Sequence, residues 1–273
     1  MRILVHLSDL HTGRLDPDVV APLVASIRCV RPDLVVISGD LTQRATKTQF
    51  LEARAFIDAL EARTLTIPGN HDVPLWNLAA RFLRPLERYK RYITADLSPV
   101  YEDDEMIVAG VNTTRSLTVG EGRIATTQVD ALLARLALSP PDATRIVVTH
   151  HPFDLPPGVH EKRLLGRARM AMARLATAGA DLFLSGHLHL SHVSHSAERY
   201  RIAGHSALIV QAGTLSMRGR GEEPSFNILR LERRRLSLGR FVWDPTKRDF
   251  LAAAEGVYQR GNDGWTADAM VVR

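Results

Sequence analysis

Five short apolar segments of this 273-residue chain each end in a small group of aspartate, asparagine or histidine residues. The groups occupy residues 9–11, 39–40, 69–72, 150–151 and 186–189. The apolar segments resemble buried strands, and residues 17–30 and 48–62, which separate the first three segments, have helical periodicity. Alternating strands and helices predict βαβ units with a largely parallel sheet. Because ligands bind at the carboxyl ends of strands in such sheets, we expect the five groups to meet at one site.

The residue types in these groups bind metal ions through oxygen and nitrogen. They include two aspartates, one asparagine and three or four histidines, which suits Mn, Fe, Zn or Co. Asp9 and His11 are two residues apart, as are His187 and His189, so each pair would project to one side of an extended chain. This set is too large for a single ion. Two ions about 3.5–4 Å apart, sharing one bridging carboxylate, would use it well.

One segment interrupts the alternation of strands and helices. Residues 75–93 have the pattern of one or two helices and directly follow a ligand group, so we interpret the region near 74–95 as a helical cap or lid. A surface helix of the scaffold or an oligomer contact are the alternatives. No linker divides the chain, which predicts a single domain over 1–273. The tail from about residue 249 is weakly patterned, and we expect a helix followed by loose chain there.

Other segments predict the remaining elements. Residues 100–111 have the pattern of a hairpin, and residues 161–179 that of one long helix. Three later segments alternate in polarity as antiparallel strands of a second sheet would; they are residues 207–211, 225–231 and 236–243.

Composition excludes several classes of protein. With 45% hydrophobic and 24% charged residues, the chain is neither disordered nor fibrous. The single cysteine, Cys29, excludes an internal disulfide and a multi-cysteine zinc site. No segment approaches the ~18–20 apolar residues of a membrane span. The first residues lack the apolar region and cleavage site of a signal peptide, so we expect a cytoplasmic protein.

The net charge is +5, and two local basic runs stand out, at residues 81–91 and 230–235. Neither has the pattern of a nucleic-acid groove, so we interpret both as solvated surface and do not expect nucleic acid as a partner. The positive field would still favour the approach of an anionic substrate.

Taken in order, the five groups resemble the signature of the calcineurin-like metallophosphoesterase superfamily. That signature runs D-x-H, G-D, G-N-H-[DE], an isolated His and G-H-x-H, and each element has a counterpart here, at residues 9–11, 39–40, 69–72, 150 and 186–189. The resemblance implies an α/β fold of the metallophosphoesterase type, a four-layer α/β/β/α sandwich with two mixed β-sheets.

The resemblance also implies a role for each residue of the groups. One metal ion would be bound by Asp9, His11, Asp40 and His189. The other would be bound by Asp40, Asn70, His150 and His187, so that Asp40 bridges the two. His71 would be the catalytic residue beside the leaving group, and Asp72 would orient it through the second imidazole nitrogen.

Three further residues are candidates for substrate contact. The pattern Thr-His-x-Pro favours His150 over His151 as the ligand, which places His151 in the pocket. Arg44 follows Asp40 by four residues and could reach a phosphate oxygen, and Asn112 follows an apolar strand at the same edge. Their alternatives are a solvated arginine and a turn residue.

Within the superfamily, the compact chain resembles the bacterial class III cyclic nucleotide phosphodiesterases. The resemblance implies hydrolysis of a small phosphodiester, of cyclic nucleotide or glycerophosphodiester type, by hydroxide at a dinuclear centre. A nucleotide-lipid pyrophosphatase of the UDP-diacylglucosamine type is one alternative, with residues 75–86 as the acyl pocket. A DNA nuclease and a non-catalytic scaffold are the others. A homodimer is possible, with residues 75–93 as its contact.

Overall fold

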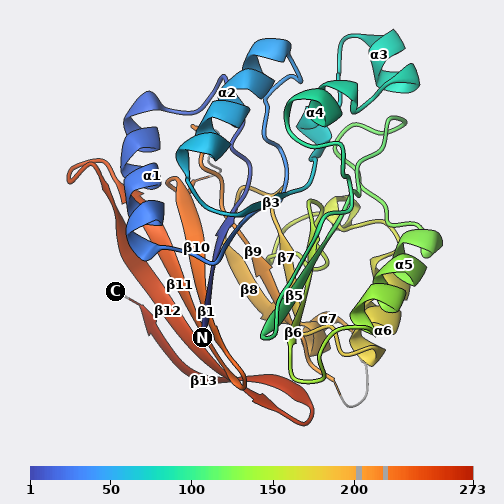
Figure 1. Ribbon diagram of the computed structural model, residues 1–273, viewed down its shortest axis with the longest axis vertical. Coiled ribbons are helices and arrows are strands. Elements are labelled where there is room, and N and C mark those ends of the chain that lie inside the picture. The colour runs from blue at the N-terminus through green and yellow to red at the C-terminus, as the bar shows by residue number, and fades with distance from the viewer. Residues whose placement is uncertain (201–204, 218–220, 273) are drawn as a thin grey trace.

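The computed structural model describes residues 1–200, 205–217 and 221–272, which form two β-sheets with helices on their outer faces (Figure 1). In spatial order, the first sheet contains β13 (Gly264–Val272), β12 (Asp249–Gly261), β11 (Arg235–Asp244), β10 (Ser225–Glu232), β1 (Arg2–Leu7), β2 (Leu34–Ile37) and β3 (Thr64–Thr66). The second contains β4 (Val100–Glu102), β5 (Met106–Val111), β6 (Thr144–Thr149), β7 (Leu182–Ser185), β9 (Leu208–Gln211) and β8 (His192–His195). The helices are α1 (Pro17–Val30), α2 (Lys47–Ala59), α3 (Leu78–Leu83), α4 (Glu87–Tyr92), α5 (Thr126–Leu136), α6 (Ala168–Thr177) and α7 (Ser196–Arg199), with 3-10 turns η1 (Asn70–Asp72) and η2 (Glu161–Arg163).

Both sheets are mixed, as expected. In the first sheet β1, β2 and β3 are parallel, and β10 to β13 extend it as antiparallel strands beyond β1. In the second, β5, β6, β7 and β9 are parallel, and the edge strands β4 and β8 are antiparallel. The carboxyl ends of the parallel strands therefore carry the loops in which the five ligand groups lie.

Alternation along the central strands divides the apolar side chains between separate cores. On β2, Leu34 and Val36 pack between the two sheets, whereas Val35 and Ile37 pack against α1 and α2. On β6, Val147 packs beneath α5 and α6, and its neighbours along the strand face the first sheet. Successive side chains of a strand point to opposite faces, so fully apolar strands are the ones that a four-layer arrangement requires.

The first helix shows how the outer layer forms. Asp16 caps α1 by accepting a hydrogen bond from the backbone N–H of Asp18 at 2.9 Å, and Pro17 stands at the first helical position. Val19, Leu23 and Ile27 recur every four residues and are all buried. This spacing places them on one face of the helix, which covers the first sheet.

The end of the chain differs from what the sequence predicted. The segment from Asp249 forms the long hairpin β12–β13 at the edge of the first sheet, in place of a helix and loose chain. The three late segments do not share one separate sheet either. β10 and β11 extend the first sheet, whereas β9 joins the second in parallel with β7.

Of two other helical predictions, the single long helix needs adjustment and the helices of the 74–95 region are confirmed. Residues 161–179 contain the short turn η2 and the helix α6, separated at Gly166 and at Arg167, whose φ is 67°. The 74–95 region contains α3 and α4, which lie at the carboxyl-terminal edge of the sheets (Figure 1). Across residues 1–200, 205–217 and 221–272, none of the helices combines the length and the apolar character needed to cross a bilayer.

Candidate active site

The loops that follow β1 and β2 run side by side and bring the first ligands together. The N–H of Asp9 donates to the carbonyl of Gly39 at 3.1 Å, and the N–H of His11 donates to the carbonyl of Asp40 at 3.0 Å. These bonds continue the ladder of the two parallel strands beyond their ends. The loops are therefore held by the sheet itself, and the side chains on them have defined positions.

Five candidate ligands have a left-handed backbone conformation. The φ angle is 54° at Asp9, 46° at His11, 52° at Asp40, 73° at His187 and 60° at His189. We expected the paired residues to share a side because the chain would be extended; the structure instead turns the backbone at each of them. This conformation costs roughly 1 kcal/mol or more for a residue with a side chain, and such strain is concentrated at functional sites.

Asp9, His11, Asp40 and His189 form one buried group whose ligand atoms lie within 4.8 Å of one another. The Nε2 atom of His11 lies 3.0 Å from Nε2 of His189 and 3.6 Å from Oδ1 of Asp9. Oδ2 of Asp9 accepts hydrogen bonds from the Ser8 hydroxyl at 2.6 Å and from the N–H of His187 at 2.9 Å. Oδ1 of Asp9 therefore faces the two imidazoles, and it is buried without a hydrogen-bond partner.

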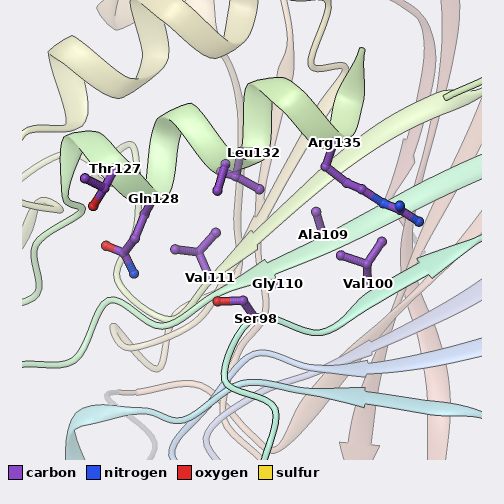
Figure 2. Close-up of a pocket in the computed structure, with 10 residues that line it drawn as sticks. Ser98, Val100, Ala109, Gly110, Val111, Thr127, Gln128, Leu132 and Arg135 are labelled. Atoms are coloured by element: carbon purple, nitrogen blue, oxygen red, sulfur yellow. The ribbon is translucent and has the colours of Figure 1, made fainter. Parts of the chain in front are cut away.

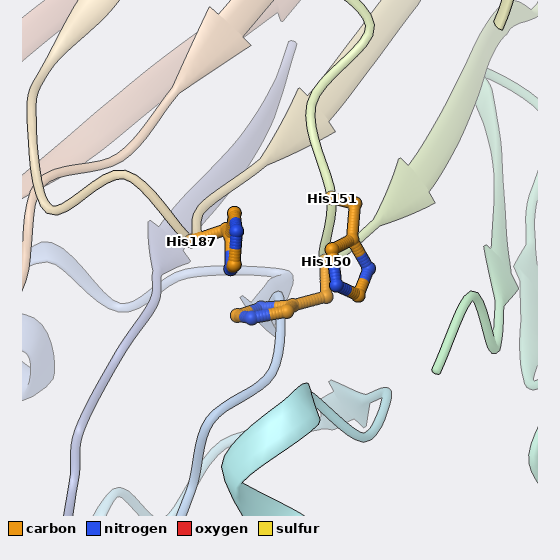
Figure 3. A group of neighbouring side chains, drawn as sticks. All are labelled: His150, His151 and His187. Carbon is orange, nitrogen blue, oxygen red and sulfur yellow. The ribbon is translucent and has the colours of Figure 1, made fainter. Parts of the chain in front are cut away.

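His150, His151 and His187 form a second group (Figure 3). Nδ1 of His150 lies 2.8 Å from the Ser38 carbonyl oxygen, so it carries the proton and leaves the lone pair of Nε2 facing the site. Nε2 atoms of His151 and His187 are both buried without a hydrogen-bond partner. Nδ1 of His151 is 2.8 Å from the Thr113 hydroxyl, which fixes that ring against the wall of the site.

Asp40, a member of the first group, also faces the second. Its Oδ2 atom is 3.7 Å from Nε2 of His11 in the first group and 3.4 Å from Nε2 of His150 in the second. The amide oxygen of Asn70 is 3.2 Å from the same atom of His150. The structure thus brings together all seven side chains that the sequence nominated as ligands, and one carboxylate faces both sets.

The donor set fits metal cations. The lone pair of His150 Nε2 faces two other acceptors, the Asp40 carboxylate and the Asn70 amide oxygen. Because three acceptors cannot hydrogen-bond to one another, only a proton or a metal ion between them satisfies this arrangement. Burial lowers the pKa of His150, but the Asp40 carboxylate outweighs it and raises that pKa to about 9. Burial, with His150 nearby, lowers the pKa of His187 to about 3, so this imidazole stays neutral and available as a ligand.

The ring of His71 is held by the backbone carbonyl of Gln43, a residue outside the predicted site. Its Nδ1 atom lies 3.0 Å from the Gln43 carbonyl oxygen, and its backbone N–H donates to Oδ1 of Asp40 at 2.8 Å. Asp72, which we expected to orient His71, has a different role. Its carboxylate accepts hydrogen bonds from the backbone N–H groups of Leu41, Thr42 and Gly69 and thereby ties two loops together. Burial and the nearby Asp40 raise the pKa of Asp72 to about 6.

Three glycines of the motifs allow this close packing. A Cβ atom on Gly69 would lie 2.2 Å from Oδ1 of Asp40. On Gly186 it would lie 2.4 Å from Oδ2 of Asp9, and on Gly39, whose φ is 101°, it would lie 2.6 Å from Nδ1 of His150. Each glycine packs against a ligand from a different strand, so a side chain there would displace that ligand.

A cleft of about 170 Å³ opens beside His71. Arg44, predicted as a substrate contact, lines it together with Asn70 and His71. Asn112 is not among the residues that line this cleft; its amide oxygen accepts hydrogen bonds from the N–H and hydroxyl of Thr114, as in the turn that was the alternative.

Several residues of the cleft were not singled out in the sequence; they are Gln43, Val73, Leu75, Trp76, Arg81 and Val119. Arg81 begins the basic run that we interpreted as solvated surface, yet it is only 5% exposed. Gln43 carried a usable signal because it follows Asp40 by three residues in the same loop.

A second cavity, of about 220 Å³, lies between α5 and the strands β4 and β5 (Figure 2). Its polar side chains are largely engaged: Gln128 donates to the Asn112 carbonyl at 2.7 Å, and Arg135 pairs with Glu102 at 2.5 Å. None of the candidate ligands lines this cavity, which separates it from the site.

Comparison with known protein families shows to which family this chain is related. The family model described as calcineurin-like phosphoesterase matches residues 1–191, which contain both ligand groups. The chain belongs to the calcineurin-like phosphoesterase family. The match ends at residue 191, so β8 to β13 lie outside the part that defines the calcineurin-like phosphoesterases.

Two curated relatives are similar to this calcineurin-like phosphoesterase. A probable cyclic nucleotide phosphodiesterase of Rhodococcus erythropolis is 30% identical over 210 residues, which are 69% of this chain and 65% of the relative. The glycerophosphodiester phosphodiesterase GpdQ of Enterobacter lignolyticus is 35% identical over 95 residues, 31% of this chain and 34% of the relative. The matches thus span just under two thirds and about one third of the relatives.

Solved structures share the fold of this calcineurin-like phosphoesterase. A dimetal phosphatase from Danio rerio has a TM-score of 0.65 at 14% identity, with 92% of this chain and 98% of that chain covered. PhoD has a TM-score of 0.73 at 9% identity, with 98% and 71% covered. At such identities the likeness concerns the architecture, and it confirms the expected four-layer sandwich of two mixed sheets.

Proposed function

We propose that this protein is a metal-dependent phosphodiesterase that hydrolyses a phosphodiester of cyclic nucleotide or glycerophosphodiester type. The position of Asp40 carries the proposal. One carboxylate oxygen faces His11 of one ligand group at 3.7 Å and His150 of the other at 3.4 Å. This arrangement suits two cations that share a bridging ligand.

The seven ligands divide between two ions in the proposed site. Asp9, His11, Asp40 and His189 would hold the first ion, and Asp40, Asn70, His150 and His187 would hold the second. A pair of divalent ions bound there supplies positive charge for the phosphate and a water of lowered pKa. The Ser38 carbonyl fixes the tautomer of His150 by accepting its Nδ1 proton, so that Nε2 faces the site.

His71 assists departure of the leaving group in this proposal. The Gln43 carbonyl accepts its Nδ1 proton, and the bond from its backbone N–H to Asp40 sets the loop relative to the centre. In its protonated form, Nε2 of His71 donates a proton to the departing alkoxide oxygen. Arg44 lines the same cleft and attracts the anionic substrate to it.

The relatives support a diester over a monoester. Both curated relatives are named phosphodiesterases, one for cyclic nucleotides and one for glycerophosphodiesters. The open cleft beside His71 provides room for the second ester group, which a monoesterase does not need.

The proposal is tested by comparing bis-p-nitrophenyl phosphate with p-nitrophenyl phosphate on chelator-stripped protein, with and without Mn²⁺. We expect metal-dependent hydrolysis with a preference for the diester. Asp40→Ala removes the shared carboxylate and should lower kcat by about 10³-fold or more. Asp58→Ala removes an exposed aspartate on α2 and serves as the control. An Asp40→Ala protein with most of its activity would refute the dinuclear arrangement.

A further inference from the structure

Exposed apolar side chains are concentrated in two segments that contribute to the lining of the cleft. In the part of the chain that the structure describes, nine large apolar side chains are more than half exposed, and six of them come from two short segments. We refer to these six as the apolar collar; they are Trp76, Leu78, Phe82, Leu83, Leu117 and Val119. Scattered exposed apolar residues need no explanation, but a cluster of this kind marks an interaction surface.

A buried arginine holds the two segments of the collar together. Arg81 donates hydrogen bonds to the carbonyl oxygens of Ser116 at 2.7 Å and Pro74 at 3.1 Å, and also to that of Thr118. Because these carbonyls belong to both segments, the guanidinium fixes α3 against the loop that contains Leu117 and Val119. The exposed apolar side chains therefore lie on two segments whose relative position is fixed by the hydrogen bonds of Arg81.

The collar is continuous with the proposed reaction site and is electrically positive. Trp76 and Val119 line the cleft together with His71, and the lining contains Arg44 and Arg81 but no carboxylate. Among the described residues, the guanidinium of Arg44 has no hydrogen-bond or ion-pair partner. Residues 74–95 contain five lysines and arginines and only one acidic residue.

An exposed indole among aliphatic side chains and cations matches the chemistry of a membrane interface. Indole rings prefer the headgroup level, aliphatic side chains enter the acyl boundary, and cations attract anionic lipids. A second copy of this chain fits less well, because a symmetric contact would bring two positive surfaces together.

We propose that the apolar collar docks the protein on an anionic lipid surface and that the substrate is a phosphodiester of a lipid headgroup. The substrate half rests on the proposed function and narrows it to acylated glycerophosphodiesters. Water adds across one P–O ester bond: its hydroxyl joins phosphorus and its proton goes to the departing alcohol oxygen. The products are a phosphate monoester and an alcohol, with no other reactant.

Docking is tested by co-sedimentation of metal-stripped protein with phosphatidylcholine vesicles, with and without phosphatidylglycerol. We expect at least about tenfold stronger binding to the anionic vesicles, weakened by added salt. Leu78→Ser combined with Leu83→Ser should reduce binding about tenfold. Leu138→Ser, which alters a side chain 74% exposed outside the collar, should change it less than twofold. Circular dichroism and thermal unfolding confirm that the variants are folded.

Tryptophan emission provides a second readout. Trp243 and Trp265 are 8% and 1% exposed, whereas Trp76 is 78% exposed, so a blue shift on vesicle addition reports Trp76. The shift should be absent in Trp76→Phe. Absence of binding, equal loss in the Leu138→Ser control, or a solution dimer that the collar variants dissociate would each overturn docking.

The substrate half has its own assay. Mn²⁺-loaded protein is incubated with the phosphatidylglycerol vesicles and the products are followed by ³¹P NMR, with bis-p-nitrophenyl phosphate hydrolysed in parallel without lipid. Conversion of the lipid diester to a monoester supports the proposal. Turnover of the soluble diester alone overturns the lipid substrate, and turnover of neither diester refutes the proposed function instead.

Discussion

Adding a single methyl group at Gly69 is predicted to disable the site while the fold remains intact. The Cβ of Gly69→Ala would lie 2.2 Å from both the backbone nitrogen and Oδ1 of Asp40, whereas ordinary contacts begin near 3.4 Å. Asp40 must therefore move by about 1 Å. Metal ligands tolerate roughly 0.2 Å, and a misplacement of 1 Å can lower a rate by about 10²-fold.

The same displacement reaches His71, because its backbone N–H donates to Oδ1 of Asp40. We expect kcat on bis-p-nitrophenyl phosphate to fall at least about 10²-fold and bound metal, measured by mass spectrometry after gel filtration, to fall below two ions per chain. Overpacking costs about 1–3 kcal/mol, which is small beside the total stability of a domain, so the variant should remain folded.

Gly261→Ala is the matched control. A Cβ on Gly261, the last residue of β12 before the turn into β13, would meet only the Gly264 carbonyl oxygen, at 3.8 Å. It should keep full activity and metal content. If Gly69→Ala kept two ions and most of its activity, close packing of Gly69 against Asp40 would not be what sets the position of the shared carboxylate.

Three further predictions follow from single side chains. His71→Ala should lower kcat by about 10²–10³-fold for diesters with alkyl leaving groups and much less for p-nitrophenyl diesters; equal losses across leaving groups would contradict proton donation. Asp72→Ala should lower the free energy of unfolding in urea by about 2–4 kcal/mol, because several backbone donors lose their acceptor, against less than about 0.5 kcal/mol for Asp58→Ala. Burial lowers the pKa of His6 from 6.5 to about 3, so between these values the unfolded chain binds one more proton at this residue. Stability is therefore complete above pH 6.5 and should fall by about 1.4 kcal/mol per unit as the pH decreases towards 3, a slope that should be shallower by one proton in His6→Gln.

The sequence predicted best which ligand groups meet, because each group directly follows the end of a strand. The groups at residues 9–11 and 39–40 were expected to meet because their strands are parallel neighbours, and the ladder between β1 and β2 brings them together. The backbone conformation within each ligand group could not be predicted from the sequence. Spacing suggested an extended chain at Asp9 and His11, whereas their φ values of 54° and 46° are positive. These φ angles depend on the hydrogen bonds that Asp9 and His11 donate to the loop after β2. The sequence of one segment alone does not show which loop will lie beside it.

The C-terminal hairpin escaped prediction for a physical reason. β12 is at most partly buried along most of its length, so apolar and polar residues need not alternate on it. Register shifts at Arg240/Phe241 and Val257/Tyr258 further break the period of two. The single helix expected over residues 161–179 is interrupted for a similar reason. The N–H of Gly166 donates to the Gly122 carbonyl at 2.9 Å, a partner far away in the sequence, and so makes no helical hydrogen bond.

The left-handed backbone at the ligands sets function against stability. Half of the ten non-glycine residues with positive φ in the described part of the chain are Asp9, His11, Asp40, His187 and His189. At roughly 1 kcal/mol each, their strain is comparable to the 5–15 kcal/mol that keeps a domain folded. Replacing one of them with glycine would relieve this strain and also remove a buried polar side chain. A selection for thermal stability alone would thus enrich glycine at these five positions. The positions that accumulate glycine would then mark the reaction centre, although the selected variants would have lost its ligands.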